Sequence, residues 1–227
     1  MATIPALPGG EAGPAAARAL QLELAGQVSR RDGFARPLRT IAGFHVEAGD
    51  EGATLHAGAV LLDAGSLQVL ATEVARVPAS APCTPGLLSF RELPALLLVL
   101  ERLPEPPDLA FVDGHGIAHP CGLGPASHFG VATGLPSIGV ARTAIFGSGP
   151  EPHQMRGAYT ALRHEGVQLG WVLRSKVDRD PLIVSPGHRV SMASAADLVM
   201  RCTGEHRLPE PTRLAGLAAR GDASPGR

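Results

Sequence analysis

The sequence predicts one α/β domain built on a mixed sheet, an antiparallel meander followed by parallel strands, with helices against the sheet faces. Three observations predict it: three consecutive strand-like runs with short polar breaks, a later alternation of apolar strands with helical segments, and 227 residues with 44% hydrophobic content, enough for one core. We place the domain at residues 13–203. Residues 1–12 and 204–227 are rich in Gly, Pro, Ala and Arg without apolar periodicity, which predicts flexible tails.

The first half of the domain begins with an amphipathic helix, predicted over residues 15–31 by its Leu, Ala and Val spacing. Short polar breaks, such as Gly65 and Ser66, then separate strand-like runs and favour antiparallel neighbours. A leucine-dense helix over residues 87–102 follows and is stopped by closely spaced prolines. The three strand-like runs are Thr40–Ala48, Thr54–Asp63 and Leu67–Val77.

The second half alternates strands and helices, which predicts parallel strands with catalytic groups near their carboxyl ends. Glu165 and Gly166 separate two further runs and predict a hairpin there. The predicted order is a strand at Leu109–Val112, a helix at Ala126–Thr133, a strand at Ser137–Val140, hairpin strands at Ala158–Leu162 and Gln168–Arg174, a strand at Pro181–Val184 and a helix at Ser191–Arg201.

Charge and cysteine content restrict the possible classes of protein. Lys and Arg total 20 against 21 Asp and Glu, so nucleic-acid binding must rest on local clusters of Arg. Three cysteines in 227 residues fit a reducing compartment, and we expect a cytoplasmic protein. There is no signal-like N-terminus and no apolar run approaching the roughly 20 residues that span a bilayer, so we expect no membrane association. We also expect a monomer.

Two carboxylates are the strongest candidates for chemistry. Asp113 directly follows an apolar strand and precedes a turn with Gly114 and Gly116, which let a ligand approach the backbone closely. An isolated Asp of this kind is more often a simple turn former. Glu92 lies one helical turn from Leu88 and Leu96, on an apolar stripe where a carboxylate needs a partner or a metal, unless it only complements the helix dipole.

Six stretches, in order along the chain, resemble the motifs of the endonuclease V family. That family shows a first-strand IAGVD-type motif, a PYIPG turn before a helix with FRE, a VDG-x-G-x-AHP stretch, a GVAK strand and a late GH pair. The matching stretches here are IAGFH (41–45), PCTPG (82–86), FRE (90–92), VDGHGIAHP (112–120), GVAR (139–142) and SPGHRV (185–190). The resemblance runs from about residue 15 to residue 203.

The resemblance implies a ribonuclease-H-like fold and a DNA repair endonuclease. Such an enzyme would recognise deaminated purines such as inosine and hydrolyse a nearby phosphodiester on the 3′ side with a divalent metal. It implies Mg²⁺ as the cofactor, with Mn²⁺ as the alternative that this chain would prefer, and damaged DNA, or RNA containing inosine, as the partner.

The resemblance also implies roles for particular residues. Asp113, Glu92 and His188 would be catalytic, and Asp113, Glu92 and the residue at position 45 would hold the metal. The deaminated base would enter a pocket of Gly86, Leu88, Gly114, Gly116 and His119. Nucleic acid would contact Pro82, Cys83, Thr84, Pro85 and Arg142. Each pocket residue also has an ordinary interpretation, because glycines serve tight turns and a His before Pro can bond local backbone.

The sequence departs from the family at three of these positions. His45 replaces an Asp, which removes a negative charge and a hard ligand for Mg²⁺, and Glu47 two residues on is a possible substitute, though more often a surface residue. Cys83 replaces a Tyr that wedges into the duplex, and a thiol lacks its stacking surface. Arg142 replaces a Lys and keeps only the charge.

These departures leave two further hypotheses open. The protein could bind inosine-containing nucleic acid without cleaving it, as a catalytically impaired homologue, which His45 and Cys83 favour. Alternatively, His115, His119 and Cys121 could form a zinc site, although the surrounding glycines and Pro120 argue against the helix that would align them.

Overall fold

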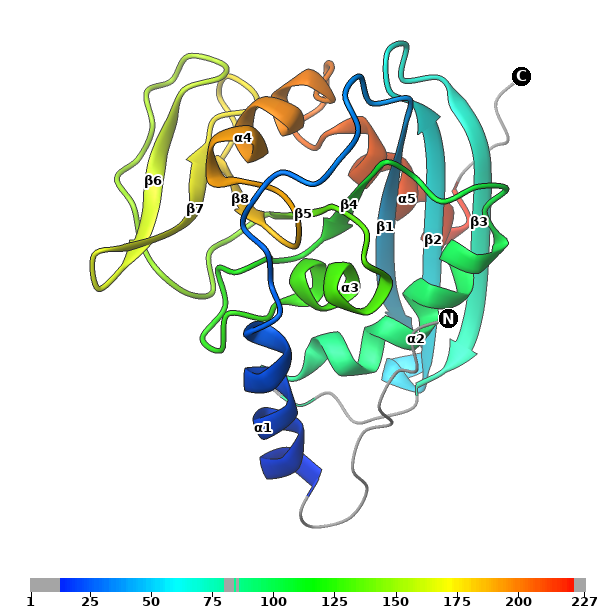
Figure 1. Ribbon diagram of the computed structural model, residues 1–227. Helices are drawn as coiled ribbons and strands as arrows, with labels where there is room; N and C mark the ends of the chain where they lie inside the picture. Colours follow the sequence, from blue (N-terminus) through cyan, green and yellow to red (C-terminus); the bar gives the residue numbers. More distant parts are fainter. Residues whose placement is uncertain (1–12, 80–83, 85, 223–227) are drawn as a thin grey trace.

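A computed structural model describes residues 13–79, 84 and 86–222 and contains one eight-stranded sheet between two layers of helices (Figure 1). The strand order is β3-β2-β1-β4-β5-β8-β7-β6. The strands are β1 (Thr40–Gly49), β2 (Thr54–Asp63), β3 (Val69–Pro78), β4 (Leu109–Asp113), β5 (Ser137–Ala141), β6 (Tyr159–His164), β7 (Val167–Leu173) and β8 (Leu182–Pro186). The helices are α1 (Gly13–Ala25), a short 3-10 turn η1 (Asp50–Gly52), α2 (Leu88–Arg102), α3 (Pro125–Thr133), α4 (Met192–Arg201) and α5 (Glu210–Arg220).

Strand directions confirm the predicted mixed sheet. β1, β2 and β3 form the antiparallel meander, and β1, β4 and β5 run parallel. The remaining strands β8, β7 and β6 are antiparallel to their neighbours, so β8 runs opposite to β5. This last direction matters for the site, because the residues that follow β8 emerge at the edge of the sheet where β4 and β5 begin.

The two helical layers follow from side-chain alternation along the strands. Ile41 and Phe111 belong to a buried cluster with residues of α4 and α5, whereas their neighbours Ala42 and Val112 pack with α2 and α3. Figure 1 shows α2 in front of the meander and α5 behind it. Both sheet faces are therefore covered, as a sheet with central parallel strands requires.

Helix α5 corrects the prediction of a flexible tail at residues 204–227. Its small residues bring its backbone against the sheet, and a Cβ at Gly43 would lie 1.8 Å from the carbonyl oxygen of Pro211. A Cβ at Gly58 would likewise meet the carbonyl oxygen of Ala215 at 2.4 Å. The packed chain therefore extends to Arg220, and only residues 223–227 at this end lie outside the described part, as do residues 1–12 at the other.

Helix α1 is shorter than predicted and ends at Ala25, followed by Gly26. Within the described residues, no helix combines the length and apolar character needed to cross a membrane.

Candidate active site

The candidate site lies where β4 ends and α2 begins. A cavity of about 430 Å³ is lined by Glu92 from α2 and Asp113 from β4. Its other lining residues come from β1, the turn before α2, the start of α2, the turn after β4, the start of α3 and the segment after β5: Val46, Thr84, Gly86, Leu88, Ser89, Gly114, His115, His119, Pro125 and Ile145. The predicted pair of carboxylates therefore shares one cavity.

Asp113 is held by two cationic or hydrogen-bonding side chains. His45 Nδ1 lies 2.6 Å from Asp113 Oδ2, and Arg142 NH1 donates to the same oxygen at 3.0 Å. Burial alone would raise the pKa of Asp113, but the hydrogen bond and charge of His45, followed by Arg142, outweigh it and hold the pKa below its usual value. Asp113 is therefore ionised at neutral pH.

Glu92 has the opposite electrostatic character. Burial, followed by repulsion from Asp113, raises the pKa of Glu92 to about 8, and the charge of Arg91 opposes this only partly. A bound cation would stabilise two nearby carboxylates of which one resists ionisation while the other is charged. The site therefore has the electrostatics expected of an oxygen-ligand cation site.

His45 is a partner of Asp113 rather than a third member of a preformed metal site. The described residues contain no group of three His, Cys, Asp or Glu side chains arranged to hold a metal ion. The ring of His45 faces α5, since a Cβ at Gly216 would lie 3.9 Å from His45 Cγ. Glu47, the possible substitute carboxylate, lies 4.0 Å from His45 Nε2 and 3.8 Å from Arg220 NH1.

Most of the predicted base pocket lies in the cavity. Gly86, Leu88, Gly114 and His119 line it, as does Thr84. Gly114 has φ +132°, which a side chain rarely adopts. Burial, and then the charge of His115, lowers the pKa of His119 to about 4, so this imidazole is neutral and suits an uncharged base edge.

The prediction that Gly116 belongs to the base pocket needs correction, because Gly116 serves packing and is not among the residues that line the cavity. A Cβ there would lie 2.0 Å from the carbonyl oxygen of Pro186 in β8. The next residue, Ile117, donates its N–H to the same oxygen at 2.8 Å. Gly116 therefore lets the chain cross β8, which a sequence pattern of two nearby glycines does not distinguish from a ligand contact.

The predicted place of His188 beside Asp113 and Glu92 also needs correction, because His188 lies at the other edge of the sheet, where β4 and β5 begin. Its Nδ1 accepts from Ser29 N at 3.2 Å, and its own N–H donates to Ser137 Oγ at 2.9 Å. Ser137 begins β5 and pairs with Ala110, whereas Asp113 pairs with Val140 at the far end of the same strands. Three residues at about 3.3 Å each separate the two positions.

The zinc hypothesis is not supported either. His115 Nε2 lies 2.9 Å from the carbonyl oxygen of Thr143, and His119 Nδ1 accepts from Cys121 N at 3.2 Å. Pro82, Cys83 and Pro85 lie outside the described residues, so their predicted contacts with nucleic acid stay predictions. Arg142, the other predicted contact, pairs with Asp113 and remains about half exposed.

Comparison with known proteins identifies the family. The family model for endonuclease V matches residues 22–217. The chain belongs to the endonuclease V family. The endonuclease V of Azotobacter vinelandii is 56% identical over 206 residues, covering 91% of this chain and 93% of that protein. That of Xanthomonas campestris pv. campestris strain B100 is 54% identical over 215 residues, covering 95% and 91%.

Solved endonuclease V structures share the fold, which is ribonuclease-H-like. The Streptomyces avermitilis endonuclease V superimposes with a TM-score of 0.88 at 40% identity, covering 97% of this chain and 96% of that one. The catalytic domain of human endonuclease V gives 0.87 at 32% identity, covering 94% and 96%. The Ciona intestinalis endonuclease V, solved in complex with a 24mer DNA containing an inosine followed by a ribo-adenosine, gives 0.79 at 24%, covering 92% and 97%.

Proposed function

We propose that this protein is a DNA repair endonuclease that takes a deaminated purine, inosine, into the cavity and hydrolyses a nearby phosphodiester on its 3′ side with a divalent metal. The observation that carries the proposal is the pairing of Glu92 and Asp113 at one cavity, with the pKa of Glu92 raised to about 8 by burial and by Asp113. Membership of a family of endonucleases supports the reaction class.

Base recognition would rest on residues that line the same cavity as the carboxylates. The cavity volume of about 430 Å³ is within the range of small-molecule sites, roughly 300–1,000 Å³. Gly86 and Gly114 line the cavity, and the neutral ring of His119, whose Nδ1 accepts from Cys121 N, has its Nε2–H left to donate. A base must leave the helical stack to reach such a pocket, which favours inosine because its pairing is weaker.

Glu92 and Asp113 fit Mg²⁺ or Mn²⁺ as two carboxylate ligands. Mg²⁺ is commonly held by one or two carboxylates together with water and substrate phosphate, so two protein ligands suffice. Such a metal supplies activation of water and stabilisation of charge on the phosphodiester. Glu92 would hold the cation as the ionised carboxylate, and Arg142, half exposed beside Asp113, is positioned to contact a phosphate.

A second candidate function is supported by the contacts of Asp113. His45 and Arg142 both bond Oδ2 of this carboxylate, which leaves fewer lone pairs for a cation. If these contacts persist when nucleic acid binds, the protein recognises inosine without cleaving, as a catalytically impaired homologue. Both functions use the same cavity, and they differ only in whether the metal displaces these partners.

The deciding experiment compares binding and cleavage on the same substrates. We would incubate the protein with end-labelled oligonucleotides that contain inosine, and with matched adenine controls, in Mg²⁺, in Mn²⁺ and in EDTA. Nicking on the 3′ side of inosine that requires metal supports the endonuclease. Preferential binding of inosine without nicking in either metal supports the silent binder, and absence of both contradicts the proposed cavity. A parallel RNA oligonucleotide determines which nucleic acid is preferred.

A further inference from the structure

The walls of the cavity are connected through a buried glutamine outside it. Gln21 lies on α1 and is 1% exposed. Its amide nitrogen Nε2 donates to the carbonyl oxygen of Gly86 at 2.9 Å and to that of Leu123 at 3.2 Å. An amide nitrogen carries two hydrogens, and here both point to carbonyl oxygens from segments that are 37 residues apart in the sequence.

The two bonded segments lead into the starts of α2 and α3, and both of these starts contribute residues to the cavity lining. Gly86 lines the cavity and directly precedes Leu87 and the first turn of α2. Its φ of +78° and the open space around its Cα leave this turn with few packing constraints of its own. No side chain caps the N-terminus of α2 at Leu87. The carbonyl of Gly86 is therefore held by Gln21 in addition to the packing of the next residue, Leu87.

Leu123 connects Gln21 to the start of α3. It precedes Gly124 and Pro125 at the start of α3, and Pro125 lines the cavity. A Cβ at Gly114 would meet Pro125 at 3.1 Å, so the position of Pro125 sets the space beside Gly114. One amide thus holds the turn before α2 and the turn before α3 at a fixed separation.

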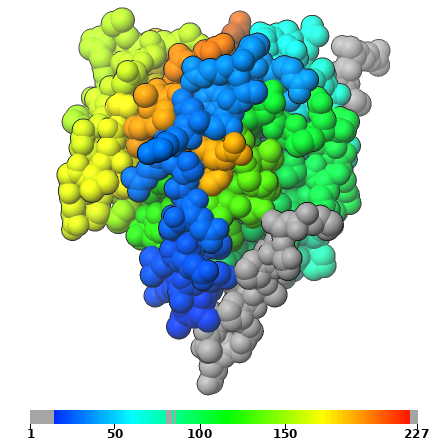
Figure 2. Space-filling view, in the orientation of Figure 1, coloured from blue at the N-terminus to red at the C-terminus, as the bar shows by residue number. Residues whose placement is uncertain are grey.

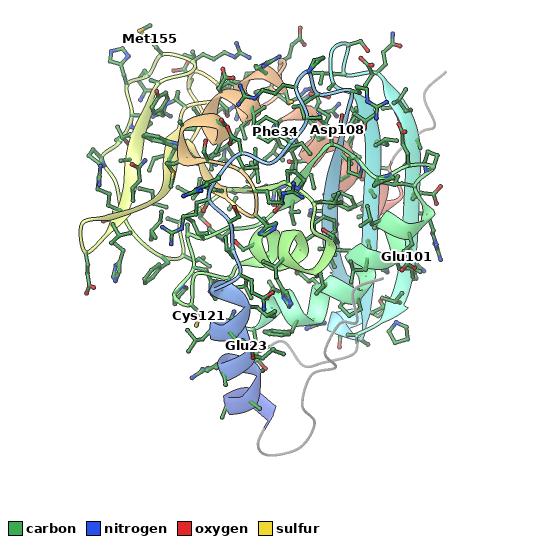
Figure 3. All side chains as sticks on the ribbon, in the orientation of Figure 1. Glu23, Phe34, Glu101, Asp108, Cys121 and Met155 are labelled. Atoms are coloured by element: carbon green, nitrogen blue, oxygen red, sulfur yellow. The ribbon has the colours of Figure 1, made fainter. Side chains whose placement is uncertain are left out.

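The placement of α1 agrees with this role. Figure 2 shows α1, in blue, projecting from the body of the molecule, and Figure 3 labels Glu23 on this helix. A Cβ at Gly122 would lie 3.8 Å from Ala25 Cβ, and Ala17 packs with Leu87. The helix therefore touches both turns, while contributing no residue to the cavity lining.

A buried glutamine is a costly choice for packing alone. Oε1 of Gln21 is buried without a hydrogen-bond partner among the described residues. An unsatisfied buried carbonyl destabilises a fold, so an apolar residue would serve a purely structural interface better. The two hydrogen bonds from Nε2 account for a glutamine at this position, because they fix two turns whose geometry shapes the site.

We propose that Gln21 is a positioning residue for the base cavity, which sets the separation of the Gly86 and Leu123 turns and so the preference for inosine over an ordinary base. This inference rests on the proposed function. Gln21 acts through the two turns and touches no substrate. The family match begins at residue 22, so the role belongs to a helix at the margin of the matched region.

The test uses two variants and a matched control in the full-length protein. Gln21→Met keeps the length of the side chain without a donor, and Gln21→Glu keeps its shape while facing both carbonyls with oxygen. Gln168→Glu is the control, because Gln168 Nε2 donates to the Gly170 carbonyl at 3.3 Å on β7, away from the cavity. Binding to inosine and undamaged duplexes is measured in EDTA at one salt concentration, beside hydrogen exchange and urea unfolding.

We expect both Gln21 variants to lower the ratio of inosine to undamaged affinity by about tenfold, with little change on the undamaged duplex. Amide exchange should accelerate around residues 86–90 and 122–128, while Gln168→Glu leaves the ratio and these amides unchanged. An unchanged ratio, an equal loss on both duplexes, or unchanged local exchange would overturn the proposal. If the natural protein showed no preference for inosine, the proposed function would be contradicted. Amide hydrogen exchange would still decide whether Gln21 holds the two turns.

Discussion

The sheet edge where β4 and β5 begin and the edge where they end both carry Asp and His residues, but these residues make different contacts. Strand β4 is preceded by Asp108 and ends in Asp113. Asp108 Oδ2 accepts the backbone N–H groups of Arg39 at 2.7 Å and Thr40 at 3.3 Å, whereas Asp113 bonds only side chains, His45 and Arg142. A carboxylate that accepts backbone N–H groups holds the chain in place. One that bonds only side chains can exchange these partners for a ligand.

The histidines repeat this contrast. His45 at the Asp113 edge bonds a carboxylate, and His188 at the Asp108 edge bonds the backbone of Ser29. Figure 3 labels Asp108 and Phe34 together at the edge away from α1, where a second and larger cavity of about 660 Å³ opens beside α4. Cavity volume alone favours the Asp108 edge, whereas paired carboxylates with a raised pKa favour the Asp113 edge as the candidate site.

The largest effect expected is from Asp113→Ala. It should lower kcat/KM on inosine DNA by at least about a thousandfold, because it removes one of two proposed metal ligands, and such a metal supplies several kcal/mol to the transition state. Asp108→Ala, at the other end of the same strand, is the control. It should keep activity within about threefold and lose about 1–3 kcal/mol of stability in urea unfolding. Comparable loss of activity in both variants would remove the distinction between the edges.

The next effect is a gain. His45→Asp should raise Mg²⁺-dependent cleavage by about tenfold or more, because it adds a hard anionic ligand beside Asp113 and removes the imidazole that occupies its Oδ2. His45→Asn, which is neutral, should give no such gain. Cleavage rates are compared in Mg²⁺ and Mn²⁺, and the gain should be smaller in Mn²⁺, which accepts imidazole. Equal rates for the Asp variant and the natural protein in Mg²⁺ would contradict a role for position 45 at this site.

A third prediction concerns pH and the raised pKa of Glu92. In metal-free protein the folded-state pKa is about 8 against an unfolded value near 4.5, so the folded state binds more protons between these values. The contribution of Glu92 to stability therefore falls as pH rises from about 4.5 to 8 and is constant above that. Glu92→Gln should remove this contribution and be more stable than the natural protein by more than about 1 kcal/mol at pH 8, measured by urea unfolding in EDTA. Equal pH dependence for the two proteins would contradict the assignment.

The sequence predicted the parts of the fold that depend on local pattern. The meander, the α2 helix and the strand that delivers Asp113 each have apolar residues at the period of their own structure, and their observed bounds differ from the predicted ones by two residues or fewer. The strand end and the apolar helix stripe marked Asp113 and Glu92 as separate candidates, and the resemblance to the endonuclease V family assigned them to one site. The cavity confirms that they lie together.

What the sequence did not predict depends on contacts between distant segments. Helix α5 buries small residues, Ala215, Gly216 and Ala218, and its Gly, Pro, Ala and Arg content was interpreted as a tail, although its buried residues follow the helical period. The direction of β8 determines at which edge of the sheet His188 lies. This direction depends on how the whole sheet is assembled and not on the local sequence. Gln21 shows only apolar neighbours in the sequence, and its two carbonyl partners lie 65 and 102 residues away.

The smallest effect on activity is expected from His188→Ala, and it separates the two edges most directly. His188 accepts one backbone N–H, from Ser29, and its loss should reduce stability by about 1 kcal/mol at neutral pH while cleavage stays within about twofold. Burial, and then the charge of Arg189, lowers the pKa of His188 below 6.5, so the folded state resists protonation. Stability from this group is present above pH 6.5 and is lost as pH falls below it, so the difference between natural protein and variant should shrink on acidification. Unfolding curves from pH 5 to 8 and cleavage rates at pH 7.5 measure both effects. A tenfold loss of cleavage with unchanged stability would place His188 in the reaction, and the functional separation of the two edges would then be wrong.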